Sequence, residues 1–251
     1  MINLKTNDWK IKNIDTVLFD KDGTFIDLHY FWGKMTELRI NAVIKKYSLD
    51  NKFFRELCLS LGYDILTQKM LKNGITALYS RPKIIELFKN DLSHHNIQAT
   101  EEEIEHIFND VSKQFYSQMN KYTKPINSAI EFIKKLNAKG VKCGIVTSDS
   151  IESTNLTIKH FQWEDLFQVV IGRESTIEDK ESGVGTKKAL QFLNSNQRTT
   201  VMIGDAPMDY IAAKNAGIEN VILVSTGQIK KEELSKISPY TVESLEYVTI
   251  Y

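Results

Sequence analysis

Cysteine and proline are both scarce in this chain of 251 residues. The two cysteines, Cys58 and Cys143, do not form a C-x-x-C pair, and the four prolines are scattered. Two isolated cysteines cannot build a disulfide framework or a thiolate metal site. We therefore expect two buried thiols in a reducing compartment.

A surplus of charge is also missing, because 32 Lys and Arg residues balance 32 Asp and Glu residues. Nucleic-acid and anionic-membrane proteins need a basic surplus, so we expect neither partner. No stretch approaches the roughly 18 apolar residues of a membrane span. The first ten residues also lack the basic-then-apolar pattern of a signal peptide. These absences, with a hydrophobic share of 42%, predict a soluble, cytoplasmic, globular protein.

The hydrophobic pattern changes twice along the chain. Residues 14–20 form a short β-branched apolar run that ends in an acid, which predicts a buried strand. From about residue 30 to 122 helical spacing dominates, with the clearest apolar stripe running from Ile104 to Met119. After Pro125 helices and strands alternate. We expect helices at 126–136, 151–161, 186–194 and 207–216, and strands at 141–147, 167–171, 200–203 and 221–224.

This alternation predicts an α/β fold with a Rossmann-like parallel sheet, covered by helices on both faces. The strand at 14–20 has no sequence neighbour to pair with, so the helical block is most simply an insertion. We therefore expect an α/β catalytic core over 1–28 and 123–251, interrupted by an all-helical cap over 29–122.

Polar side chains collect where the expected strands end. The sequence places there Asp20, Asp22, Thr147, Ser148, Asp149, Gly204 and Asp205, with Asp209 nearby. Because the carboxyl ends of parallel strands share one edge of a sheet, these groups should converge. Carboxylates held close together repel one another, and a hard divalent cation relieves that repulsion. Oxygen ligands without a paired histidine indicate Mg²⁺ rather than Zn²⁺, in an arrangement typical of phosphate chemistry.

Three segments resemble motifs of the haloacid dehalogenase superfamily, in its phosphatase branch. Residues 19–24, F-D-K-D-G-T, are similar to the D-x-D-G-T signature, and 146–148, V-T-S, resemble the second motif. Residues 203–209, I-G-D-A-P-M-D, are similar to the fourth motif, G-D-x-x-x-D. The helical block lies where phosphoglycolate-phosphatase-like members carry a helical cap. The resemblance therefore covers almost the whole chain.

The resemblance implies a Mg²⁺-dependent phosphatase that acts through an aspartyl-phosphate. Asp20 would be the nucleophile, and Asp22 would protonate the leaving oxygen and then deprotonate water. Thr147 would hydrogen-bond a phosphoryl oxygen, with Ser148 beside it in the substrate site. A cap that closes over the site implies a small-molecule phosphate ester as substrate. The protein itself would be a monomer or a homodimer.

The same resemblance implies the metal ligands. Mg²⁺ would be held by the Asp20 carboxylate, the Asp22 backbone carbonyl and Asp205, with Asp209 behind them. The third motif of the family, a lysine, has no clear match because no Pro-x-Pro follows any candidate. Spacing to Asp205 as in phosphoglycolate-phosphatase-like members favours Lys180 as a catalytic and substrate-binding residue. Spacing as in phosphoserine-phosphatase-like members favours Lys187.

Other interpretations were compared with this one. A calcium-binding loop counted from Asp20 would place Phe25 and Phe31 where Gly and Glu are required. Residues 183–187 lack the spacing of a phosphate-binding P-loop. A receiver domain is about half this length and has no cap. A β-phosphoglucomutase-like phosphosugar mutase remains the alternative, because it shares nearly every motif and differs in how its cap shields the aspartyl-phosphate from water. A non-catalytic binding protein is disfavoured, since every charged group that the chemistry requires is present.

Three residues follow the D-x-D-G-T segment into the expected cap: His29, Trp32 and Arg39. In capped relatives this stretch borders the substrate. Aromatic side chains at such positions also pack the interior of a helical domain. The sequence does not decide between these two roles.

Overall fold

The computed structural model describes all residues from Met1 to Tyr251, and the chain folds as two units. The first unit combines Met1–Asp27 with Pro125–Tyr251, and the second is Leu28–Lys124. In the first unit the Ile126 N–H donates to the Phe25 carbonyl at 2.9 Å. The segment that leaves this unit and the segment that returns to it therefore run side by side.

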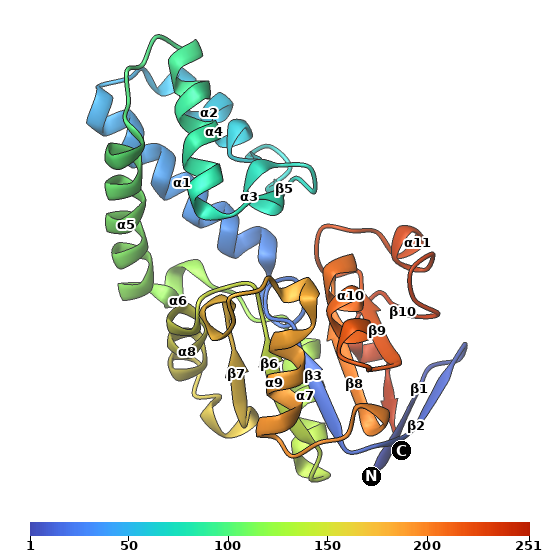
Figure 1. The fold of residues 1–251 in the computed structure, drawn as a ribbon. Coiled ribbons are helices and arrows are strands. Elements are labelled where there is room, and N and C mark those ends of the chain that lie inside the picture. The colour runs from blue at the N-terminus through green and yellow to red at the C-terminus, as the bar shows by residue number, and fades with distance from the viewer. The chain divides into compact units, whose positions relative to one another are not determined.

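A six-stranded sheet lies at the centre of the first unit (Figure 1). Its order is β10 (Tyr240–Val242), β9 (Asn220–Val224), β8 (Thr200–Gly204), β3 (Thr16–Phe19), β6 (Lys142–Val146) and β7 (Val169–Ile171), and all neighbours are parallel. The central strand β3 is buried along its whole length, which explains its apolar sequence. The predicted α/β class with a parallel sheet is confirmed. The strand expected at 14–20 is shorter than predicted, because Ile14 belongs to β2.

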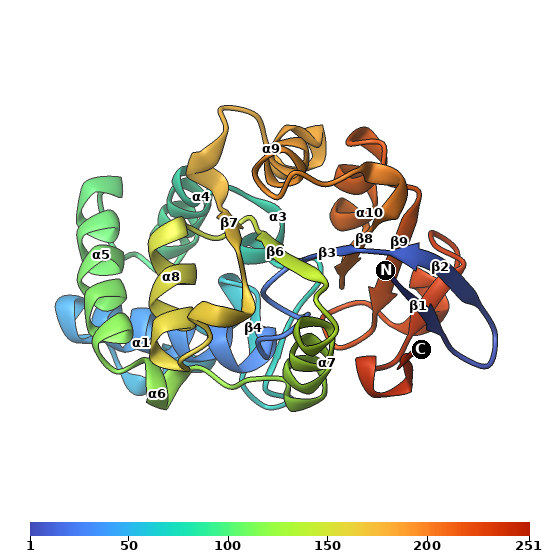
Figure 2. The same cartoon turned by 90° about the horizontal axis from the view of Figure 1, so that it is seen from below.

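Helices cover both faces of this sheet. They are α7 (Asn127–Ala138), α8 (Ile151–His160), α9 (Val184–Phe192) and α10 (Pro207–Asn215), and a short α11 (Lys231–Leu234) precedes β10. Figure 2 shows α9 and α10 on one face of the sheet and α7 on the other. On the α9 side, Leu190 and Leu193 pack with Leu18 and Met202 of the sheet in one buried cluster. The apolar stripes of the helices thus account for their placement.

A three-stranded antiparallel sheet of the first unit was not predicted. It contains β11 (Thr249–Ile250), β1 (Ile2–Lys5) and β2 (Lys10–Ile14), in that order. Because β1 pairs with β11, the two ends of the chain lie next to each other (Figure 1). The strands are only two to five residues long, which is too short for a clear alternating pattern, and β2 reads Lys-Ile-Lys-Asn-Ile.

The second unit is mainly helical. It contains α1 (Leu28–Tyr47), α2 (Phe54–Ser60), α3 (Ile75–Leu78), α4 (Arg81–His94), α5 (Glu101–Ser117) and α6 (Met119–Tyr122). Its interior is aromatic: Phe31 meets Phe115 edge-on at 4.9 Å, and Phe88 meets Phe108 at 6.0 Å. A two-stranded hairpin, β4 (Tyr63–Asp64) and β5 (Lys69–Met70), also belongs to this unit and was not predicted, because each strand is only two residues long. No helix of the chain is both long enough and apolar enough to cross a bilayer.

Candidate active site

The segment after β3 forms a tight turn at the carboxyl edge of the parallel sheet. Asp20 follows the last residue of β3, and its N–H donates to the Ile203 carbonyl of β8 at 2.8 Å. The Lys21 carbonyl accepts the N–H groups of Phe25 and Ile26, both at 3.1 Å. Gly23 has a φ of +88°, a conformation that glycine adopts without strain. The turn therefore holds Asp20 and Asp22 at the end of the central strand.

Three carboxylates gather at this edge. One oxygen each of Asp20, Asp205 and Asp209 lies within 4.8 Å of the other two, and all three residues are buried. Asp205 follows β8, and Asp209 lies in the first turn of α10, where it accepts the Ala206 N–H at 3.0 Å. The sequence argument that strand-end acids converge is consistent with this geometry.

Two glycines make room for the Asp205 carboxylate. A Cβ on Gly23 would stand 2.4 Å from Asp205 Oδ2, and one on Gly227 would stand 1.7 Å from the same atom. Both distances are far shorter than a non-bonded contact, so no side chain fits at either position. Gly23 belongs to the predicted motif. Gly227 was not singled out from the sequence, because its proximity to Asp205 depends on the path of the chain after β9.

Lys180 brings an ammonium group into the acidic cluster. Its Nζ lies 2.6 Å from Asp20 Oδ1 and 2.5 Å from Asp209 Oδ1, and its side chain is 5% exposed. It comes from a single 3-10 turn, Lys180–Ser182, in the loop that leads into α9. Of the two lysines that the sequence left open, Lys180 is therefore the one that contacts the candidate nucleophile.

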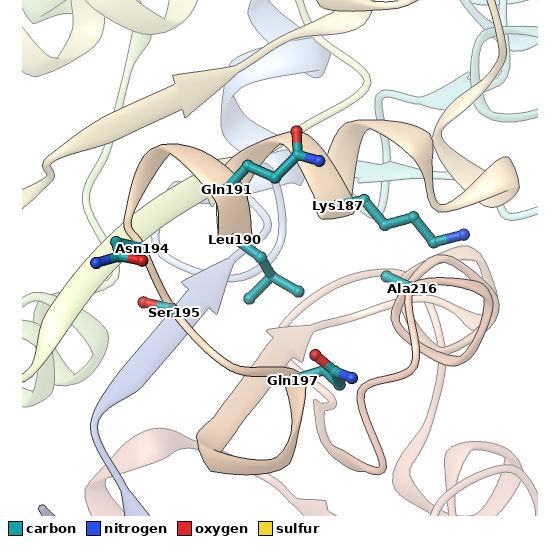
Figure 3. Close-up of a pocket in the computed structure, with 7 residues that line it drawn as sticks. All are labelled: Lys187, Leu190, Gln191, Asn194, Ser195, Gln197 and Ala216. Atoms are coloured by element: carbon teal, nitrogen blue, oxygen red, sulfur yellow. The ribbon is translucent and has the colours of Figure 1, made fainter.

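Lys187 lies elsewhere, on α9. It lines a surface pocket of about 570 Å³ together with Leu190, Gln191, Gln197 and Ala216, as Figure 3 shows. Gln197 precedes β8 and Ala216 precedes β9, so this pocket is near the edge where the parallel strands begin. The acidic cluster is at the opposite edge, where they end.

Burial and mutual repulsion oppose ionisation of the clustered acids. Burial is the main cause that raises the pKa of Asp20 to about 7; Asp209 adds to it and Lys180 opposes it. Burial, followed by the charges of Asp20 and Asp209, holds the pKa of Asp205 well above its usual range. Burial acts to lower the pKa of Lys180, but Asp20 and Asp209 outweigh it, so the pKa lies above its ordinary value. The single Lys180 ammonium therefore does not offset the negative charge of the three carboxylates.

The donor set of the cluster fits a hard divalent cation. Two of the three buried carboxylates, those of Asp20 and Asp209, contact the Lys180 ammonium, and neither histidine nor cysteine belongs to the group. Oxygen ligands of this kind suit hard cations such as Mg²⁺, Ca²⁺ and Mn²⁺. A cation bound here would offset the repulsion that raises the pKa of Asp20 and Asp205.

Thr147 and Ser148 follow β6, the strand next to β3. Thr147 is 4% exposed, and its Oγ1 accepts the Asp149 N–H at 3.1 Å. Ser148 is exposed, with its Oγ 3.6 Å from the sulfur of Met208. Both lie at the same sheet edge as Asp20, because β3 and β6 are paired in register up to Phe19 and Ile145.

Lys21 is a charged residue of the site to which the sequence analysis gave no role. Its side chain is fully buried, and its Nζ lies 2.7 Å from Asp22 Oδ1 and 3.0 Å from Asp149 Oδ2. Its position in the sequence could have indicated that it has charged partners. A lysine that directly follows the apolar strand Thr16–Phe19 and Asp20 must be paired if it is buried.

The three residues whose role the sequence leaves open all belong to α1 of the second unit. The His29 Nδ1 accepts the Met70 N–H at 3.1 Å, and Trp32 meets Phe31 edge-on at 5.3 Å. The Arg39 guanidinium is buried and lies over the Phe108 ring at 4.3 Å. Burial lowers the pKa of Arg39 to about 9, with Arg81 contributing. Each therefore has a packing role within its own unit, and a role toward substrate stays a prediction.

Known proteins resemble this chain over most of its length. The family model described as haloacid dehalogenase-like hydrolase matches residues 17–224. A phosphoglycolate phosphatase of Psychrobacter arcticus is 28% identical over 229 residues, which are 89% of this chain and 88% of that one. The pyrophosphatase PpaX of Halalkalibacterium halodurans is 23% identical over 210 residues, or 84% and 83% of the two chains.

A solved structure shares the fold. The crystal structure of a predicted phosphoglycolate phosphatase from Haemophilus somnus superposes with a TM-score of 0.71 at 17% identity, over 94% of this chain and 96% of that one. Together these matches confirm three predictions from the sequence: the family, the α/β fold class and the enzyme class of phosphatase.

Proposed function

The chain belongs to the haloacid dehalogenase-like hydrolase family, and on that basis we propose that it hydrolyses small phosphate monoesters with Mg²⁺ through a phosphorylated Asp20. One observation carries the proposal. The Asp20 carboxylate lies at the end of the central strand, 2.6 Å from the Lys180 ammonium and within 4.8 Å of Asp205 and Asp209. The group proposed as nucleophile, an ammonium group and the proposed metal ligands thus lie close together.

In the first step an oxygen of Asp20 attacks phosphorus, and the bond from phosphorus to the ester oxygen breaks. Asp22 gives a proton to the departing oxygen, so that an alcohol leaves. In the second step Asp22 takes a proton from water as the water oxygen attacks phosphorus, and the bond from phosphorus to the Asp20 oxygen breaks. Inorganic phosphate and the free Asp20 carboxylate result, and every atom is accounted for.

Lys180, Thr147 and Ser148 would bind the phosphoryl oxygens. The Lys180 ammonium can offset negative charge that would otherwise repel the attacking carboxylate. The hydroxyl groups of Thr147 and Ser148 can donate hydrogen bonds and so orient the phosphoryl group.

The Asp20 and Asp205 carboxylates and the Asp22 backbone carbonyl would hold Mg²⁺, with Asp209 supporting the site. When bound, the cation supplies positive charge to the phosphoryl oxygens. Asp209 already accepts the Ala206 N–H and contacts Lys180, so it is well placed to keep the cluster in position.

We further propose that the helical unit, Leu28–Lys124, acts as the cap of the core and limits the substrate to small metabolites. The names of the relatives suggest phosphoglycolate and pyrophosphate as the first compounds to test. The β-phosphoglucomutase-like alternative requires the same core residues, and no feature of the described site favours it.

The test is release of inorganic phosphate from a panel of phosphoglycolate, sugar phosphates, nucleoside monophosphates and pyrophosphate, with Mg²⁺ and with chelator. We expect Mg²⁺-dependent release from at least one compound. Asp20→Asn keeps the shape of the side chain and removes its charge, so release should fall by about a thousandfold or more. Full activity of Asp20→Asn, or the absence of release from the whole panel, would contradict the proposal. Conversion of a sugar 1-phosphate to its 6-phosphate without release would indicate the mutase instead.

A further inference from the structure

Buried ionic contacts connect Asp22, the proposed acid–base residue, to a residue that follows the neighbouring strand β6. Lys21 Nζ contacts Asp22 Oδ1 at 2.7 Å and Asp149 Oδ2 at 3.0 Å. The side chain of Lys21 has no exposed area, whereas that of Asp22 is 12% exposed. Asp22 therefore contacts a fully buried ammonium group while part of its own side chain is exposed.

Asp149 is itself fixed by the backbone. Its Oδ1 accepts the Ser150 N–H at 2.7 Å, and its own N–H donates to Thr147 Oγ1 at 3.1 Å. Ser150 is the N-terminal capping residue of α8, where its side chain accepts the Ser153 N–H. The contact from Lys21 to Asp149 thus ends on the rigid start of a helix.

Burying an ammonium group needs strong compensation, and folding alone does not require one at this position. The transfer of a charge from water costs several kcal/mol before its partners offset that cost. An apolar residue after the apolar strand Thr16–Phe19 would avoid the cost. A lysine here instead places two of its three N–H donors on carboxylates of two adjacent strand ends.

We propose that Lys21 is a positioning residue for Asp22. Asp149 holds the Lys21 ammonium in place, and the ammonium binds Oδ1 of Asp22, so that Oδ2 stays directed to the reacting oxygens. The inference rests on the proposed function in one respect, the acid–base role of Asp22. Without Lys21 the Asp22 carboxylate loses the contact to its Oδ1, and proton transfer depends strongly on the geometry of that carboxylate.

The expected signature is a dependence on the leaving group. An alkyl phosphate releases a strongly basic alkoxide and needs the proton of Asp22, whereas p-nitrophenyl phosphate releases a weakly basic phenolate and needs it much less. Lys21→Met should therefore lower kcat/KM for an alkyl phosphate by about tenfold to a hundredfold, which is part of the usual contribution of general acid catalysis. For p-nitrophenyl phosphate the loss should be less than about threefold.

Two further variants separate positioning from folding. Lys21→Met leaves Asp149 as an unpaired buried charge, so the double variant Lys21→Met/Asp149→Asn removes both charges and keeps an acceptor for the Ser150 N–H. It should fold and show the same leaving-group dependence. In an Asp22→Asn background, Lys21→Met should change kcat/KM no further, because the group that it positions is already disabled. Lys187→Met serves as the matched control at a lysine away from the cluster.

Equal losses for both substrates, or an additive loss in the Asp22→Asn background, would overturn the proposal and leave Lys21 with a purely structural role. The proposed function has a separate readout in the same experiment. If the unaltered protein releases no phosphate, or if Asp20→Asn stays active, the acid–base assignment fails first. If Asp20→Asn is inactive and Lys21→Met shows no leaving-group dependence, only the positioning role fails.

Discussion

Replacing Lys180 by alanine is the sharpest test of how charge is balanced at the acidic cluster. The change removes an ammonium group that lies 2.6 Å from Asp20 and 2.5 Å from Asp209. At such a distance one ion pair amounts to roughly 6 kcal/mol of gross Coulomb energy for an effective dielectric constant of about 20. Most of that energy offsets desolvation and is present before the reaction begins.

The part that affects the rate is the interaction with the phosphoryl group. Attack by Asp20 brings the negative charge of the phosphoryl oxygens into a cluster whose carboxylates already outnumber its one ammonium group. Loss of a preorganised donor of this kind costs about 3 kcal/mol of transition-state stabilisation. We therefore expect Lys180→Ala to lower kcat/KM at least about a hundredfold. Lys187→Ala should change it less than about fivefold, since Lys187 lines the pocket at the far edge of the sheet.

The assay is phosphate release at saturating Mg²⁺, accompanied by thermal unfolding of each variant. Unfolding matters because Asp20 and Asp209 lose their buried partner, which can cost about 3–5 kcal/mol of stability. Lys180→Gln keeps hydrogen-bond donors without the charge and serves if the alanine variant unfolds. A folded Lys180 variant within fivefold of the unaltered protein, or a large loss in Lys187→Ala instead, would refute the reasoning and move the catalytic lysine to position 187.

The remaining predictions concern the metal site. Mg²⁺ at about a hundred times its Kd should stabilise the protein by about 2.7 kcal/mol, and Asp205→Asn should abolish most of this stabilisation in a thermal-shift titration. In chelator, Asp205→Asn should melt at a higher temperature than the unaltered protein, because it removes one of three repelling buried carboxylates; a lower melting temperature would contradict this. Gly227→Ala should weaken Mg²⁺ binding, since its Cβ would stand 1.7 Å from Asp205 Oδ2. Gly185→Ala is the matched control, because the atom nearest to its Cβ would be Cγ2 of Ile171, 3.1 Å away. Equal Mg²⁺ affinity of the two variants would show that the position of Asp205 does not depend on Gly227.

The main elements of the core could be predicted because their signals are local and strong. Three of the four residues of β3 before Asp20 are apolar and all four are buried, and such a run has few alternatives to a buried strand. The small sheet of β1, β2 and β11 could not be predicted, because its pairing joins the two ends of the chain. Pairing at that separation depends on the whole fold, and the short polar strands contribute no pattern of their own.

The acids of the site follow from chain order, whereas their cationic partners do not. Asp20, Asp22 and Asp205 each follow an apolar strand, so their edge of the sheet could be deduced. Lys180 and Lys187 are both on the segment that leads into and through α9, and spacing alone could not show which one turns toward Asp20. That choice depends on a loop with a single 3-10 turn, Lys180–Ser182, and loops carry little periodicity.

The strand order explains why the site contains two separate clusters of charged residues, one around Lys180 and one around Lys21. β3 lies between β8 and β6, so the turn after β3 meets acids from both sides. On the β8 side, Asp20 shares Lys180 with Asp209 and lies beside Asp205. On the β6 side, Lys21 contacts both Asp22 and Asp149, and Asp149 lies shortly after β6. Because each of the two aspartates in the turn has its own ammonium partner, Asp20 and Asp22 can differ in environment while standing two positions apart.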